Sequence, residues 1–151
     1  MTVDTTRARL AALQAQITGV TKAFENVPRG ILEVELPAFI TLVGRAAYNQ
    51  VQLGELVLME TRIYTQRLFI KTASLGIEGE AEDETTVFFD RVVDFFKDRP
   101  QLQLDANSTV VYSAQITADS GVIPTAYPSG GSVKTFLAID FTTEVIEVRR
   151  I

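Results

Sequence analysis

The chain of 151 residues has an ordinary globular composition, with 46% hydrophobic and 22% charged residues, and a net charge of −5. It contains neither cysteine nor histidine. These two absences exclude disulfide bonds, zinc sites with cysteine or histidine ligands, and catalysis by serine–histidine or cysteine–histidine pairs. The negative charge argues against tight binding to duplex DNA, which normally requires a basic surface.

The sequence predicts a soluble protein that is made in a cytoplasm. Residues 1–10 lack the apolar stretch of a signal peptide, and the longest apolar runs, such as Leu56 to Met59, are too short to cross a membrane. The length fits a single domain over residues 1–151, and neither a repeat nor a linker divides it.

The first half of the chain predicts one helix followed by strands. A helix is expected from about Thr5 to Thr18, with Asp4 as its amino-terminal cap. Two strands follow, at about Val20–Asn26 and Ala38–Val43. The polar stretch Gly44–Gly54 is then expected to connect two antiparallel strands.

A long strand and a second helix occupy the middle of the chain. The strand is expected at about Leu56–Thr72, and its apolar phase shifts near Gln66, which indicates a bulge or a strand covered on both faces. The helix is expected from about Glu82 to Asp98 and is apolar on more than one side. Phe88, Val92, Phe95 and Phe96 follow i, i+4, i+7, i+8 spacing and are expected to face the sheet. We expect Phe89 and Val93 to lie on its flank.

Two further strands are predicted at the carboxyl end, at about Val110–Thr117 and Val133–Arg149. The segment between them, Ala118–Ser132, reads as a long loop, and such loops are usually functional or disordered. The whole pattern predicts an α+β fold, a mostly antiparallel sheet of about five strands with two helices packed on one face.

Two groups of carboxylates suggest chemistry but favour simpler interpretations. The acidic run Glu78–Glu84 can bind Ca²⁺ or Mg²⁺, yet acidic residues also stabilise the first turn of a helix. Glu33 and Glu35 would share one face of an extended segment, as a glycosidase pair would, but nothing else in the sequence supports catalysis there. We therefore predict that the chain is not an enzyme and that it has no catalytic, cofactor-binding or metal-binding residues.

Five segments in succession carry a resemblance to a known family. They are a short helix that ends in ITGV, the strand entry LPAFITLVG, the long strand METRIYTQRLFIKTAS, the helix FFDRVVDFFKDRP, and the late segment ITADSGVIPTAYPSGG. This order, which covers most of the chain, resembles that of the tail-terminator (tail-completion) proteins of long-tailed phages.

The resemblance implies a structural virion protein at the head–tail junction. It would form a ring, typically a hexamer, that caps the tail tube, ends tube polymerisation and presents a surface to the head–tail connector. DNA would pass through the lumen without specific binding, and no membrane or cofactor would be involved. Subunits in such rings pair through strand edges and helix flanks.

On this resemblance, interface residues are expected on the long strand, on the second helix and on the late loop. They are Arg62, Tyr64, Arg67, Phe89, Val93, Gly121, Tyr127, Gly130 and Gly131.

Other interpretations stay open at this point. The main alternative is a head–tail connector or stopper protein of the neck, which shares the size, acidity and ring habit. A small cellular α+β binding module comes next, and a carboxylate-dependent enzyme comes last.

Overall fold

The computed structural model describes residues 2–52, 56–73, 78–105 and 109–150. Within these ranges the chain forms two α-helices, five β-strands and one short 3₁₀ turn. In chain order they are α1 (Val3–Gln14), β1 (Lys22–Phe24), η1 (Glu33–Glu35), β2 (Ala38–Gln52), β3 (Leu56–Thr72), α2 (Glu78–Lys97), β4 (Ser113–Ser129) and β5 (Ser132–Arg150).

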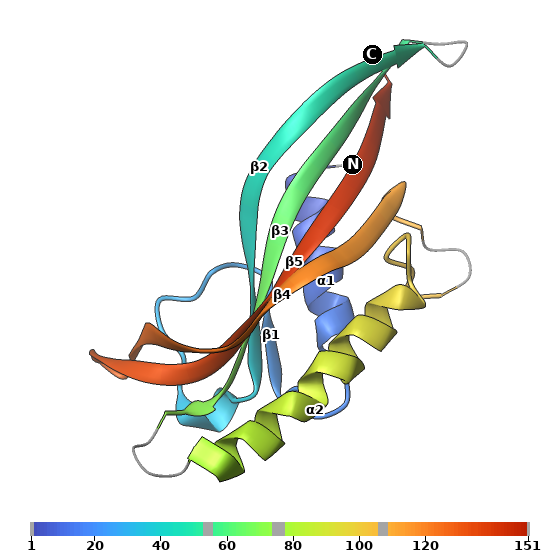
Figure 1. The fold of residues 1–151 in the computed structure, drawn as a ribbon. Coiled ribbons are helices and arrows are strands. Elements are labelled where there is room, and N and C mark those ends of the chain that lie inside the picture. The colour runs from blue at the N-terminus through green and yellow to red at the C-terminus, as the bar shows by residue number, and fades with distance from the viewer. Residues whose placement is uncertain (1, 53–55, 74–77, 106–108, 151) are drawn as a thin grey trace.

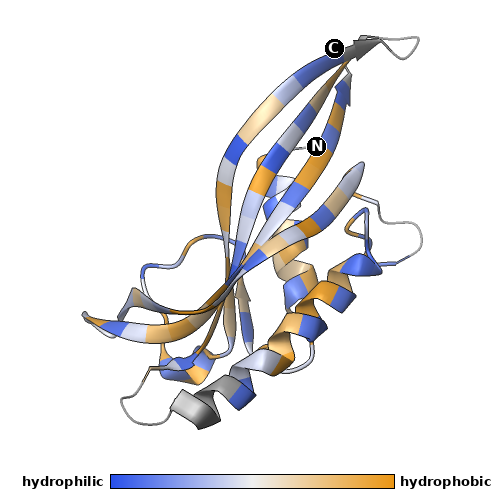
Figure 2. Ribbon diagram, viewed as in Figure 1, coloured by the Kyte–Doolittle hydropathy of each residue, from blue (hydrophilic) through white to orange (hydrophobic). Residues whose placement is uncertain are grey.

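The strands form one open sheet in the order β1-β2-β3-β5-β4. β1 runs parallel to β2, and every other neighbouring pair is antiparallel. This arrangement confirms the predicted α+β fold. Figure 1 shows that β2, β3 and β5 continue past both helices as a long curved arm, and Figure 2 shows apolar and polar residues alternating along these strands.

The main core lies between the two helices and one face of the sheet, which we call the helix face. Leu10 and Leu13 of α1 are fully buried there. Phe88, Val92 and Phe96 of α2 are at most 5% exposed, and Phe95, the fourth residue of the predicted stripe, packs against this core but is only partly buried. The sheet residues buried in this core include Phe39, Tyr64, Leu68, Ile139, Phe141 and Val145.

A smaller core lies on the opposite face of the sheet, which we call the open face. Its buried members are Ile31, Ala38, Ile40, Phe69, Phe136 and Ala138, and Phe24, Leu36 and Tyr127 pack against them. Since Leu68 and Phe69 enter different cores, β3 is covered on both faces over part of its length, as its mixed pattern predicts. The register shift between β3 and β5 falls between Phe69 and Lys71, a few residues beyond the predicted position near Gln66.

Two predicted connections are strands in the structure. Most of Gly44–Gly54 belongs to β2, which extends to Gln52, while residues 53–54 lie outside the described residues. Most of Ala118–Ser132 belongs to β4, which extends to Ser129. The loop signals in β4 are Pro124, Pro128 and Gly121. Proline is tolerated because β4 is an edge strand, and glycine is tolerated because it sits in a register shift between Asp119 and Val122.

A two-residue turn joins β4 to β5. Gly130 and Gly131 have φ angles of 58° and 84°, the left-handed values that a type I′ hairpin turn requires at both central positions. Glycine adopts such angles without the strain that a Cβ atom would cause. The predicted long loop is therefore the end of a tight hairpin.

Smaller corrections concern the amino-terminal half. Helix α1 ends at Gln14 rather than Thr18, and Thr2, not Asp4, caps it, accepting a hydrogen bond from the Thr5 backbone N–H at 3.2 Å. Glu33 and Glu35 lie in a 3₁₀ turn rather than a strand, so the strand-face pairing considered for their carboxylates is wrong.

Candidate assembly interface

The sheet leaves a long edge on each side. On one side, β1 pairs with β2 only along Ala38–Ile40, so in the described part of the chain no strand covers the outer edge of β2 from Thr41 to Gln52. On the other side, β4 is the last strand, and its outer edge faces no further strand in the same described ranges. Unpaired strand edges are templates for pairing with another chain.

The outer edge of β4 differs along its length. In the half nearer the hairpin turn, Pro124 and Pro128 lack a backbone N–H, and the Pro128 carbonyl already accepts a hydrogen bond from Ile31 at 2.9 Å. In the other half, the Ala114 N–H points away from β5 and donates to the Pro100 carbonyl at 2.6 Å. Because backbone groups alternate along a strand, the N–H and C=O of Ile116 also point outward.

A groove of about 410 Å³ runs between α2 and this half of β4. From α2 it is lined by Val93, Phe96 and Lys97, and from β4 by residues 113–116. Phe96 is 3% exposed and forms part of the core, whereas Val93 is 38% exposed. Pro100 lines the groove as well and covers the edge of β4 at Ala114. The groove thus offers apolar surface beside an edge that is open at Ile116.

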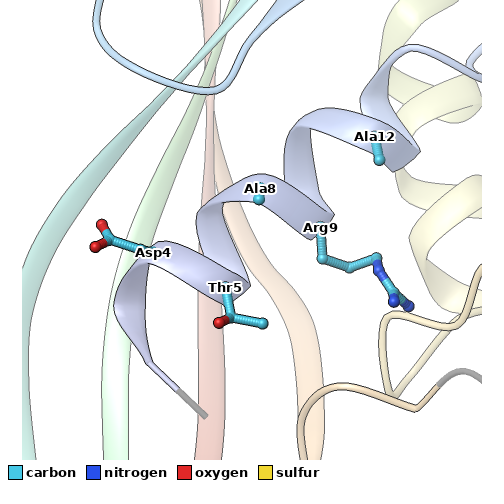
Figure 3. A pocket seen from close by; sticks show the side chains of 5 residues that line it. All are labelled: Asp4, Thr5, Ala8, Arg9 and Ala12. Atoms are coloured by element: carbon cyan, nitrogen blue, oxygen red, sulfur yellow. The ribbon is translucent and has the colours of Figure 1, made fainter.

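A second hollow, of about 460 Å³, lies along α1 (Figure 3). It is lined by Asp4, Thr5, Ala8, Arg9 and Ala12. The Asp4 and Arg9 side chains point away from each other in Figure 3. Each is bound elsewhere: Arg7 pairs with Asp4 at 2.7 Å, and Arg9 donates to the Leu102 carbonyl at 2.9 Å. This hollow therefore does not bring reactive groups together.

The three predicted interface residues of β3 do not share a surface. Arg62 lies on the helix face and donates to Glu60, the Gly44 carbonyl and the Tyr48 hydroxyl at 2.7–3.0 Å. Arg67 lies on the open face and makes a bidentate salt bridge with Asp140, with distances of 2.7 and 3.0 Å. This contact raises the pKa of Arg67.

Tyr64 lies inside the main core. It is 1% exposed, and burial, with a further contribution from the Glu147 carboxylate, raises its pKa to about 12. The expectation that Tyr64 faces a neighbour is therefore corrected. The Tyr64 side chain lies on the helix face of β3, where the helices cover it.

Phe89 and Val93, the two predicted flank residues of α2, differ in their exposure. Phe89 is half-buried, and its ring packs edge-on against Phe141 with centroids 6.5 Å apart. Val93 is exposed and lines the groove beside β4. Of the two, Val93 is the flank residue that remains available to a partner.

The four predicted residues of the late segment lie at separate places. Gly121, with a φ of 70°, sits in the middle of β4, while Gly130 and Gly131 form its terminal turn. Tyr127 packs on Phe69 with ring centroids 5.3 Å apart, and its hydroxyl donates to the Pro28 carbonyl. Tyr127 therefore anchors the loop over residues 28–31 to the small core and does not form a free tip.

A buried charged network lies under the first turns of α1 and was not predicted from the sequence. Glu60 and Glu147 stand directly opposite each other on β3 and β5 and are 1% and 3% exposed. Arg149 lies 2.6 Å from Glu60, Arg62 contacts the other oxygen of Glu60, and the Thr6 hydroxyl donates to Glu147. The repeated spacing Glu60-x-Arg62 and Glu147-x-Arg149, which puts each pair on one strand face, is the signal that would have found it.

Metal and membrane features are not seen in the ranges described above. No group of three or more aspartate or glutamate residues there is placed to hold a metal ion. No helix of those ranges is long and apolar enough to cross a membrane. The acidic run Glu78–Glu84 belongs to the first turns of α2.

No family model matches the chain, and no curated protein matches it.

Proposed function

We propose that this chain is a structural virion protein that caps the tail tube of a long-tailed phage as a ring. In this role it ends tube polymerisation and provides the surface that joins the tail to the head–tail connector. The proposal combines the succession of segments described above with the shape of the sheet.

The observation that carries the proposal is the pair of unpaired edges on one open sheet. β2 and β4 are different surfaces, so an interface between them is head-to-tail rather than two-fold. A head-to-tail interface closes into a ring when its rotation closes. A sheet that ends in two such edges therefore suits a ring subunit better than a solitary chain, which would leave both edges without strand partners.

The arm supports the same role. β2, β3 and β5 extend beyond both helices, and most β2 side chains from Val43 to Gln50 are exposed. An exposed arm of this kind can reach a component stacked above or below the ring, such as the tail tube protein or the connector.

The test is tube assembly with purified components. The tube protein of the same phage is polymerised with and without the chain, and tube lengths are measured by electron microscopy. The proposal predicts that added chain binds one tube end and stops elongation, while heat-denatured chain has no effect. Unchanged tube growth with no chain at the tube ends would overturn it.

A further inference from the structure

We infer that the ring is closed by antiparallel pairing of β2 from one copy with β4 of the next, with Thr41–Val43 lying against Ile116–Asp119. This inference rests on the proposed ring. It adds which edges meet, in which register, and which side chains enter the groove beside α2.

Strand directions permit this pairing. β4 is antiparallel to β5, β5 to β3, and β3 to β2. β4 therefore runs opposite to β2 within one chain. A neighbour of the same orientation presents its β2 antiparallel to β4, so the sheet continues from copy to copy.

The register follows from the ladder across one chain. Ile116 pairs with Thr143, Thr143 with Tyr64, and Tyr64 with Val43, so Ile116 and Val43 lie at the same level on opposite edges. By the same tracing, residues 113–119 of β4 lie level with residues 47–41 of β2.

The free parts of the two edges coincide at this level. β1 covers β2 only at Ala38–Ile40, and the prolines of β4 start at Pro124. Both obstacles lie toward the hairpin turn from the Val43–Ile116 level. On the other side, the Pro100 carbonyl already binds the outward N–H of Ala114. The segments that remain, Thr41–Val43 and Ile116–Asp119, are those that a neighbour of equal height would place side by side.

The side chains at this level fit the groove. Val43 and Ile116 both lie on the helix face, since their ladder partners Tyr64 and Thr143 are buried there. Val43 is 40% exposed, and Val93 at the groove is 38% exposed. A neighbouring Val43 set beside Ile116 would cover Val93, so that both exposed valines become buried.

Disulfide trapping tests the pairing, because the natural chain has no cysteine. Val43→Cys and Ile116→Cys are combined in one chain. Within a chain the two positions are separated by three strand spacings, or about 14 Å, too far for a disulfide. Mild oxidation should yield a ladder of covalent multimers ending in a closed ring. A Tyr48→Cys and Ile116→Cys control, four ladder positions out of register, should yield no ladder of multimers.

A substitution pair provides a second readout that needs no oxidation. Val43→Asp should abolish the oligomer seen by native mass spectrometry while leaving the melting temperature of the monomer unchanged. Val133→Asp, which alters a valine that is 68% exposed at the other end of the sheet, should leave the oligomer intact.

The outcomes separate this inference from the proposed function. Rings that form but do not cross-link through these cysteines, or that survive Val43→Asp, overturn the edge pairing and leave the ring standing. Cross-linking of the Val43→Cys single variant into dimers overturns the pairing in favour of β2 against β2. Absence of any oligomer, with or without tube protein, overturns both.

Discussion

At the scale of single residues, the charged groups under α1 are bound so tightly to one another that none can be removed alone without cost. Glu60 is 1% exposed and lies within 2.6 Å of both Arg62 and Arg149. Glu147, which lies opposite Glu60, accepts a hydrogen bond from the Thr6 hydroxyl of α1. Removing the buried Glu60 carboxylate leaves the guanidinium groups of Arg62 and Arg149, which are 18% and 40% exposed, without their shared partner.

Glu60→Gln should therefore lower the free energy of unfolding by about 3 kcal/mol. The measurement is urea denaturation followed by circular dichroism. Glu144→Gln, on the open face of β5, is the matched control and should change stability by less than about 0.5 kcal/mol. A loss for Glu60→Gln as small as that of the control would contradict the network.

Tyr64 should make the fold sensitive to alkali. Its pKa is raised from 10.0 to about 12, so the folded chain keeps a proton that the unfolded chain loses in this range. Stability is therefore unaffected by Tyr64 below about pH 10 and falls as the pH rises toward 12. Melting temperatures measured across this range should fall more steeply for the natural chain than for Tyr64→Phe; equal slopes would show that Tyr64 titrates normally.

At the scale of elements, the β4–β5 hairpin depends on its turn. Gly130 has a φ of 58°, a conformation that asparagine tolerates and a β-branched residue does not. Gly130→Val should cost about 1–2 kcal/mol, whereas Gly130→Asn should be close to neutral. Thermal denaturation of the two variants checks this, and equal losses would argue against the type I′ geometry.

The elements also show what sequence patterns can reveal. The stripe Phe88, Val92, Phe96 predicts α2 and its buried face, because a helix with one covered side must repeat its apolar residues at this spacing. The lengths of β2 and β4 escape prediction. Their outer parts are exposed at a sheet edge, where polar residues, glycine and proline are all compatible with a strand, so local composition there resembles that of a loop.

The candidate interface is predictable to a similar extent. Val93 can be assigned to the flank of α2 because the helix is apolar on more than one side. Tyr64 cannot be told from a surface residue, since β3 has apolar residues of both parities and only the packing of the helices decides which face is covered. The counter-charge to Arg67, Asp140, is 73 residues away and is brought near only by the fold.

At the scale of the whole molecule, the net charge of −5 bears on the passage of DNA. Association with duplex DNA is driven largely by neutralisation of its phosphates, and this chain carries a surplus of acidic groups. In about 0.15 M salt, we expect no retardation of a DNA duplex by the purified chain in a gel shift assay. Retardation that weakens steeply with added salt would instead indicate a basic surface in the assembled ring.

The proposed role of the chain is to end the growth of a tail tube. Electron microscopy of lysates from the phage with the gene for this chain deleted, with and without a plasmid copy, tests this role directly. We expect free tails of unregulated length beside unjoined heads, and normal virions when the plasmid copy is supplied. Tails of normal length beside heads that have lost their DNA would contradict it and would indicate a connector or stopper instead.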